Sequence, residues 1–289
     1  EDTVIKEVEK NENVTTAPEV SKPEKPSTGG GSTGGGDSGP TYYTITFDDN
    51  DGNTETTVAS QSLTYGSKIQ KPTSPTKEDA VFAGWFNGNK RWDFDNGTVK
   101  GSMTLTAKWA ESALTVEDSL EGSEIKNNQV VQLKNVLFAN GADVTVWNND
   151  NSDTAQLLVQ VGDTISYFDN VDKQLTIFAG SKKTDVTPTS VAGATITIES
   201  GKVNRVYGGG YESDVTGTTV INVNEKADAT MVIGGGTISH TNMKTGKANT
   251  NKVEINIAGK VDILYAGGYA PVGPSMTDIV NIQERSEER

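Results

Sequence analysis

A glycine-rich line of sequence recurs three times in the second half of the chain and constrains the fold more than any other feature. Its copies centre on Gly209, Gly235 and Gly267. A period of roughly 20 to 50 residues is typical of solenoids, propellers and other repeat arrays. A short segment of alternating apolar and polar residues precedes each copy, and a fourth lies near the end of the chain; these segments are 195–198, 220–223, 254–257 and 279–282. The repeat therefore predicts stacked β-strands.

The four alternating segments share one register. Side chains point to opposite faces of a strand in turn, so the apolar positions lie on one face and the polar positions on the other. The inward ladder is predicted to contain Ile196, Ile221, Ile255 and Val280, and the outward column Thr197, Asn222, Asn256 and Asn281. These ladders predict a right-handed parallel β-helix, or β-solenoid, over residues 194–289. The polar insert at 239–251 is interpreted as a loop off a corner.

The glycine runs are interpreted as the corners between strands. Glycine permits positive φ and lets neighbouring backbones approach closely, and a tight corner needs these properties. The alternative is a phosphate-binding loop, which needs a following helix and a Lys-Ser/Thr pair. The sequence has neither at these positions.

The overall composition excludes several classes of function. The 289 residues carry a net charge of -14 and 33% hydrophobic residues, and they include no cysteine. Phosphate contacts need clustered Lys and Arg, so we expect no nucleic-acid partner and no adsorption to an anionic membrane. Without cysteine there is no disulfide, no thiolate chemistry and no Cys-ligated zinc. An acidic chain rich in Thr, Asn and Gly is typical of bacterial surface proteins.

Residues 1–40 are predicted to be a disordered low-complexity linker. They include a Gly/Ser/Thr tract at 27–36, and their small apolar surface cannot offset the entropy cost of ordering. No signal peptide, membrane-spanning run or lipidation motif is visible, so we expect no membrane insertion of this chain. The chain begins at Glu1 and stops inside a repeat without an evident cap, so we expect the natural protein to continue.

Residues 41–110 are predicted to form a compact module. Segment 43–47 alternates like a strand, and the polar run 48–53 that follows is typical of a turn. Three of the chain's four tryptophans lie in this module, which is enough for a small core. Trp85 and Trp109 are the predicted core residues, and we expect the module to fold alone.

The same residues carry a family resemblance. The matching segments, in order, are 44–48, the Asn-Asp-Gly turn at 50–52, 65–67, Pro72 with Pro75, 82–86, 92–94 and 105–109. Together they resemble the Listeria–Bacteroides repeat, the B repeat of internalin B-type surface proteins. Asp79-Ala80 departs from the usual Gly-Tyr of that family. The resemblance implies a small β-grasp-like α/β fold, a secreted or wall-attached location, a role as stalk or adhesive module, and no catalytic residue.

Residues 111–193 contain short β-like segments separated by polar turns, a spacing that suits all-β structure. They are interpreted as the N-terminal cap and early rungs of the β-helix, because no linker separates them from Ala194. A separate sandwich is the alternative. The repeats that follow resemble the Gly-Gly-Gly-rich β-helical regions of bacterial surface proteins.

The sequence offers few candidates for chemistry. The single histidine, His240, lies in the polar insert and is interpreted as a solvent-exposed loop residue rather than a catalytic one. The runs 48–52 and 148–153 offer oxygen ligands of the kind calcium takes, but neither has the terminal Glu of a full calcium loop. Both are interpreted as turns, with a weak calcium site at 148–153 as the alternative. We predict no catalytic, cofactor-binding or metal-binding residue.

Four tyrosines lie beside the glycine corners: Tyr207, Tyr211, Tyr265 and Tyr269. They are interpreted as a packed ladder, and a sugar-stacking platform is the alternative.

Two classes of function remain. The first is a non-enzymatic bacterial protein, extracellular or on the cell surface, that serves as a stalk or adhesion module. Its candidate partners are a host glycan, a mucin, a surface protein and the cell envelope. The second is a carbohydrate-active β-helix enzyme, a polysaccharide lyase or glycosidase. Such an enzyme needs paired carboxylates at a cleft, or calcium-binding acids with a basic residue. The sequence favours the first class, because no acidic column recurs across the rungs and Arg205 is replaced by Met231 and Ile263 in the next copies.

Overall fold

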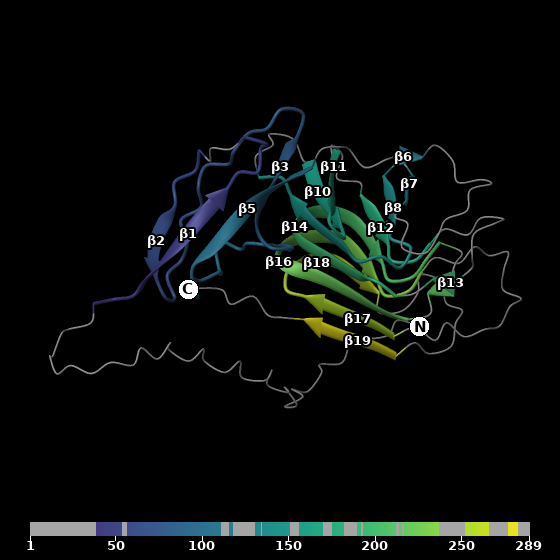
Figure 1. The fold of residues 1–289 in the computed structure, drawn as a ribbon. Coiled ribbons are helices and arrows are strands. Elements are labelled where there is room, and N and C mark those ends of the chain that lie inside the picture. The colour runs from purple at the N-terminus through teal and green to yellow at the C-terminus, as the bar shows by residue number, and fades with distance from the viewer. Residues whose placement is uncertain are drawn as a thin grey trace, which may run out of the picture. The chain divides into compact units, whose positions relative to one another are not determined.

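The structure is a computed structural model that describes residues 39–53, 57–110, 116–117, 131–133, 135–150, 156–169, 175–181, 190–191, 193–211, 214–215, 217–236, 252–265 and 277–282 (Figure 1). The chain divides into two units, residues 1–40 and 41–289. The predicted linker lies outside the described residues apart from its last two positions. The described residues contain strands, turns and irregular segments but no helix, which confirms that the chain is mainly β.

Residues 41–110 hold a five-stranded sheet. Its strands are β1 (Tyr42–Asp48), β2 (Gln61–Thr64), β3 (Val81–Asn87), β4 (Lys90–Arg91) and β5 (Met103–Ala110), in the order β2-β1-β5-β3-β4. The central pair β1–β5 is parallel, and the other neighbours are antiparallel. No helix occurs within 41–53 or 57–110, so the helical part of the expected α/β module is absent from these residues.

The core of this sheet lies around Trp85, which is 1% exposed. Its ring contacts Phe47 and Phe82 edge-on, with centroids 5.0 and 5.6 Å apart. Ile45 and Leu105 are fully buried beside it because the alternation of β1 and β5 turns them to the same face. The predicted core position of Trp85 is confirmed. Trp109 is only half-buried, and its Nε1 donates to the Asp49 carbonyl oxygen at 3.1 Å.

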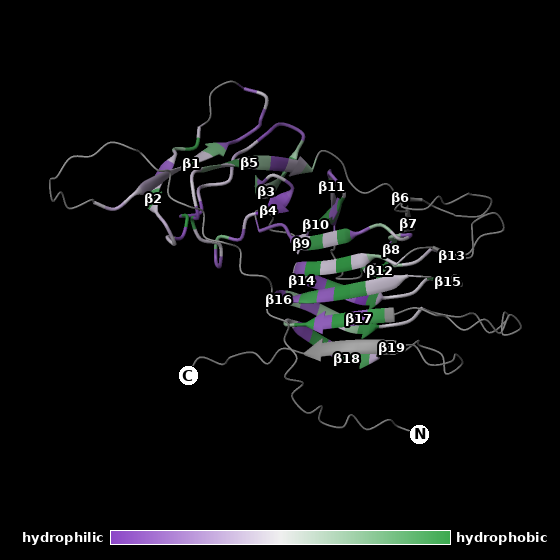
Figure 2. Ribbon diagram, turned by 60° about the horizontal axis from the view of Figure 1, so that its bottom comes forward, coloured by the Kyte–Doolittle hydropathy of each residue, from purple (hydrophilic) through white to green (hydrophobic). Residues whose placement is uncertain are grey.

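The second half of unit 41–289 is built from two columns of parallel strands. The strands involved are β8 (Val136–Phe138), β9 (Val144–Asn148), β12 (Thr176–Phe178), β14 (Thr195–Tyr207), β16 (Thr218–Ile233), β17 (Lys252–Ile257), β18 (Lys260–Tyr265) and β19 (Thr277–Ile282). One column runs β8, β12, β14, β16, β18, and the other runs β9, β14, β16, β17, β19. We call these columns the stack; Figure 2 shows β9, β14, β16, β17 and β19 one above another.

The predicted register of the stack is confirmed. Ile196 pairs with Ile221, Ile221 with Ile255, and Ile255 with Val280, all in parallel. The three isoleucines are fully buried. On the opposite face Asn256 Nδ2 donates to Asn222 Oδ1 at 2.9 Å, and Asn222 Nδ2 donates to Thr197 Oγ1 at 3.2 Å. The polar column is therefore a hydrogen-bonded ladder.

Two details of the repeat differ from expectation. In the first two copies the alternating segment and the following glycine-run segment merge into one long strand, with a register shift between Ile198 and Ser200. The described glycine runs, 208–210 and 234–236, do not adopt positive φ, and the third run lies outside the described residues. A Cβ on Gly208 would lie 2.2 Å from the Gly234 carbonyl oxygen, so these glycines are required by the close approach of stacked corners.

A hairpin of β10 (Gln156–Val161) and β11 (Thr164–Asp169) extends β9 in antiparallel order. Val144 and Val146 of β9 pair in parallel with Ile196 and Ile198 of β14, so the three-stranded sheet β9–β10–β11 joins the end of the stack. The remaining short strands are β6 (Val116–Glu117), β7 (Val131–Leu133), β13 (Ser190–Val191) and β15 (Asp214–Val215).

Candidate functional site

The residues considered for chemistry do not come together in the described part of the chain. His240 lies outside the described residues. No group of three or more His, Cys, Asp or Glu able to hold a metal occurs among the described residues. The absence of a catalytic, cofactor or metal site stays a prediction.

The polar run 48–53 uses its oxygens within the turn. Asp49 is buried, and its Oδ2 accepts from the Thr57 backbone N–H at 3.0 Å. Asp51 accepts from the Asn53 backbone and side-chain N–H groups at 2.8 and 2.9 Å. Those two hydrogen bonds hold the pKa of Asp51 below its usual value. The interpretation as a turn is thus supported, because the carboxylates already have donors.

The second acidic run is only partly described. Asn149 Nδ2 donates to Gln156 Oε1 at 2.7 Å, and Asp150 pairs with Lys71 at 3.6 Å. Residues 151–155 lie outside the described part.

The described tyrosines, Tyr207, Tyr211 and Tyr265, do not form the predicted ladder. An aromatic column does run along the stack, but it consists of Phe138, Phe178 and Tyr207, with successive centroids 5.2 and 4.3 Å apart. Ile233 continues it on the next rung, while Tyr265 beyond is 45% exposed. Tyr211 contacts Phe178 edge-on, and Tyr269 lies outside the described residues.

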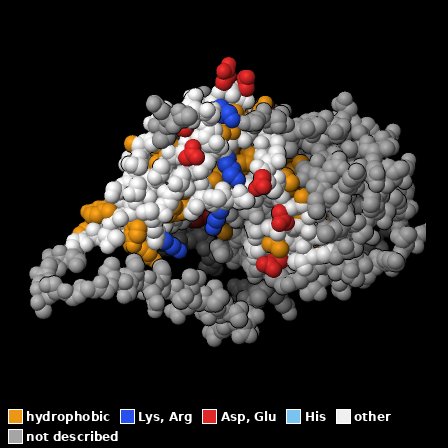
Figure 3. All heavy atoms as spheres, viewed as in Figure 1, with side chains coloured by type: hydrophobic (Ala, Val, Ile, Leu, Met, Phe, Trp, Pro, Cys, Tyr) orange, Lys and Arg blue, Asp and Glu red, His pale blue; other side chains and the backbone are white. Residues whose placement is uncertain are grey.

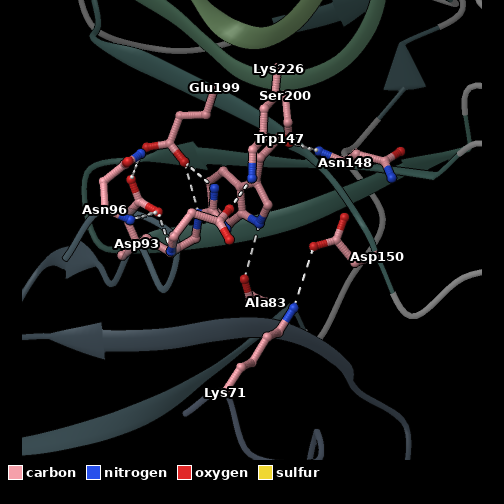
Figure 4. Close-up of polar contacts among 12 residues, drawn as sticks. Lys71, Ala83, Asp93, Asn96, Trp147, Asn148, Asp150, Glu199, Ser200 and Lys226 are labelled. Carbon is pink, nitrogen blue, oxygen red and sulfur yellow. Dashed lines mark hydrogen bonds and ion pairs between the residues drawn. The ribbon is translucent and has the colours of Figure 1, made fainter. Parts of the chain in front are cut away.

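A cluster of buried side chains joins the five-stranded sheet to the β9–β10–β11 sheet; we call it the joint. Trp147 is at its centre and is 2% exposed. It packs with Ala83, Phe86, Ala110, Leu158 and Ile165 in one buried cluster. Its Nε1 donates to the Ala83 carbonyl oxygen at 3.0 Å, and Figure 4 shows this bond crossing between the two sheets.

The local structure of β3 places that carbonyl. A bulge lies between Phe82 and Gly84, so Ala83 has no partner in the register with β5. Gly84 has φ of 131°, a conformation that favours glycine. Bulges re-aim the groups of a strand, and here the bulge is where the Trp147 indole binds.

Charged pairs surround Trp147. Arg91 Nε and Nη2 donate to Glu199 Oε2 at 2.8 and 2.5 Å, and the guanidinium lies 5.3 Å from the Trp147 ring centroid. Lys226 binds Asp95, and this hydrogen bond raises the pKa of Lys226. On the face drawn in Figure 3, Lys and Arg side chains are dispersed among acidic and uncharged ones.

Two hollows lie near the sheets. One has a volume of about 40 Å³ and is lined by Trp85, Trp92 and Trp147 among others. A cavity needs a volume of roughly 10–15 Å³ to hold one water molecule. The buried indole N–H groups of Trp85 and Trp92 have no partner among the described residues. We therefore expect water rather than a ligand there. The other, of about 470 Å³, is lined by Asn50, Gly52, Lys77, Lys108, Trp109, Asp163 and Ile165. Its volume is in the range of small-ligand sites.

Comparison with known proteins assigns the five-stranded sheet. Residues 43–108 match the Listeria-Bacteroides repeat domain. A protein named as a Gly-rich membrane protein and a second one named as a membrane protein, both of Evansella cellulosilytica, are 38% and 37% identical over 87 and 83 residues. Internalin H of Listeria monocytogenes is 38% identical over 74 residues. These alignments cover 29%, 28% and 24% of this chain.

The chain spans only 10%, 12% and 13% of the lengths of these three relatives. No solved structure matches. Among the described residues, no helix is long and apolar enough to cross a membrane.

Sequence reasoning located the repeat domain but missed the joint. Trp147 falls among the short β-like segments predicted within 111–193, and Arg91 and Glu199 carry no motif. The one available signal was the position of Trp147, the single tryptophan outside the repeat domain.

The Asp93 turn at the edge of the joint gives a pH-dependent prediction. Burial acts to raise the pKa of Asp93, but hydrogen bonds from the Asn96 side chain and the Asp95 and Asn96 backbone N–H groups outweigh it and lower the pKa. A carboxylate whose pKa is lowered in the folded state stabilises the fold at pH values above its unfolded-state pKa of about 3.9. This stabilisation is lost as the pH falls through the lower pKa of the folded state. Because Asp93 is exposed, the effect is below about 1 kcal/mol.

Asp93→Asn is therefore expected to lower the free energy of unfolding slightly at neutral pH. The difference in stability from wild type should vanish at a pH below the folded-state pKa of Asp93. Urea unfolding as a function of pH measures it, with Asp163→Asn as a control of equal charge change. A difference that grows as the pH falls would contradict the proposed role of the turn.

Proposed function

We propose that this chain is part of a non-enzymatic bacterial cell-surface protein in which it serves as a stalk or adhesion module. The observation that carries the proposal is the Listeria-Bacteroides repeat at 43–108 together with relatives named as membrane proteins and internalin H. The location that follows is the cell envelope or the outside of the cell.

The stack supports a structural role. We propose that 194–289 is a right-handed parallel β-helix, that 111–193 contributes its early rungs and N-terminal cap, and that 41–110 is a β-grasp-like module. Each rung of such an array covers the apolar edge of its neighbour, so length is gained without a larger core. A stiff, extended body of this kind suits a stalk.

The geometry gives less support to a polysaccharide lyase or glycosidase. Such enzymes need paired carboxylates or a cation held at a cleft. In the stack Arg205 pairs in register with Met231, and Met231 pairs with Ile263, so its charge does not repeat on the adjacent rungs.

The proposed partners are a host glycan, a mucin or a host surface protein. The 470 Å³ hollow is the place to test first, because Trp109 lines it with Lys77 6.0 Å above its ring. An aromatic face combined with lysines suits an acidic sugar.

We expect the chain to bind a subset of a host glycan and mucin panel and to leave every member intact. Lys77→Ala should weaken that binding, whereas Lys260→Ala, an exposed lysine of the distant strand β18, should not. New reducing ends or unsaturated products after incubation with polygalacturonate or mucin glycans would contradict the non-enzymatic proposal.

Antibody labelling of intact and permeabilised cells tests the location. Labelling only after permeabilisation would contradict the surface location.

A further inference from the structure

The sheet β9–β10–β11 has buried apolar side chains on both faces. Val144, Val146, Leu157 and Val159 belong to the core of the stack. Trp147, Leu158 and Ile165 belong to the separate cluster of the joint, and they are 2%, 1% and 6% exposed. The terminal unit of a repeat array normally presents a polar outer face, because no further repeat covers it. This terminal sheet does not.

What covers the outer face is the repeat domain. Ala83 and Phe86 of β3 and Ala110 of β5 complete the buried cluster around Trp147. The core of the repeat domain itself is a different cluster that contains Trp85 and Phe47. The domain thus keeps its own core and offers a second apolar surface to the stack.

We propose that the Listeria-Bacteroides repeat of this chain completes the cap of the stack by covering the outer face of the β9–β10–β11 sheet, and that it stays bound there without the chain connection between them. The repeat is then an integral part of one rigid body instead of an independent bead on a string. This inference goes beyond the proposed function and does not depend on where the protein is located or what it binds.

The polar contacts of the joint make the docking specific. The Trp147 indole is a donor only, and in the buried cluster it finds an acceptor in the Ala83 carbonyl at 3.0 Å. Buried polar groups require such partners, so the sheets cannot slide past each other without leaving the indole unpaired. The bulge at Ala83 and the register shift of β14 at Glu199 lie on opposite sides of the joint.

The ion pairs fix the orientation of the domain rather than provide most of the affinity. The side chains of Arg91 and Glu199 are each 28% exposed, and those of Lys71 and Asp150 are more than half exposed. Exposed pairs contribute little each because water screens them. Three pairs spread around Trp147 nevertheless select one rotation of the domain on the stack, as charge pairs do at interfaces.

A cleavage experiment on the full chain tests the proposal. A site-specific protease sequence is inserted between residues 111 and 115, so that β6 stays on the same side of the cut as its partner β7. The chain is cut to completion, and the product is applied to gel filtration at about 0.15 M salt. We expect the two halves to elute together as one species. After cleavage of Trp147→Ala they should separate, whereas Tyr265→Ala, at the far strand β18, should leave them together.

A second variant keeps the test decisive if Trp147→Ala disturbs the hairpin. Arg91→Ala removes a partly exposed side chain that belongs to neither core, and it should raise the dissociation constant of the cleaved halves by roughly fivefold. Separation of the wild-type halves would overturn the proposal. So would an affinity that neither Trp147→Ala nor Arg91→Ala changes, because the association would then run through another surface.

Discussion

Ile255→Asp is expected to unfold the C-terminal rungs of the stack. Ile255 is fully buried and pairs with Ile221 on one side and Val280 on the other. A carboxylate there would lie in the apolar cluster that contains Ile221, and burying an unpaired charge is among the costliest single changes. We expect a loss of about 4 kcal/mol or more, measured by urea unfolding.

The matched control is the next residue. Asn256 lies on the partly exposed face, where its Nδ2 donates to Asn222 and to Glu254. Asn256→Asp removes these donors and brings a carboxylate near Glu254, so it should cost about 1 kcal/mol. Hydrogen exchange should show β17 losing protection in Ile255→Asp and keeping it in Asn256→Asp. Equal losses in the two variants would mean that the register of the ladder is wrong.

The register of the stack was predictable because it depends on two strong regularities. Period-two alternation assigns each residue to a face, and the recurrence of the pattern aligns one copy with the next. A slip by one residue would bury Asn222 and Asn256 and expose Ile221 and Ile255, so few other registers compete. The core of the repeat domain was predicted from its tryptophans instead, and of the two that were named Trp85 is buried whereas Trp109 is only half-buried.

The corners were harder to predict because glycine serves two purposes. Positive φ and close backbone approach both select glycine, and the sequence does not distinguish them. In the structure Gly201 takes positive φ, while Gly208 and Gly209 are required by the backbone of the next rung. The segments merge into the long strands β14 and β16 because their parallel pairing resumes after the register shift between Ile198 and Ser200.

The joint was not predictable because its contacts are tertiary. Trp147 and Ala83 are 64 residues apart, and Arg91 and Glu199 are 108 apart. Neither pair lies in a local motif. An arginine in a polar stretch of sequence normally predicts only a solvent-exposed side chain. A bulge such as that at Ala83 leaves no distinct pattern in one sequence, because Gly84 is compatible with a turn, a bulge or a close approach.

Trp85→Ala is expected to have the largest effect in the repeat domain. Trp85 is 1% exposed and holds Phe47 and Phe82 through edge-on ring contacts. Replacing a buried tryptophan with alanine removes the transfer free energy of the ring and leaves a cavity, a cost of about 3–5 kcal/mol. Loss of the ring contacts adds to this cost. Thermal unfolding measures the change, and Tyr65→Ala, whose ring is 65% exposed, should stay within about 0.5 kcal/mol of wild type.

The consequence for the stack separates two views of the repeat domain. If the domain is the cap, unfolding it uncovers Trp147, Leu158 and Ile165, so Trp85→Ala should also speed hydrogen exchange in β10. The isolated fragment 41–110 is still expected to fold, because its core around Trp85 is its own, but it would expose Phe86 to water. A Trp85→Ala chain with a normal melting temperature would contradict the core assignment. Lost stability of the domain with unchanged exchange in β10 would instead show that the stack does not need its cap.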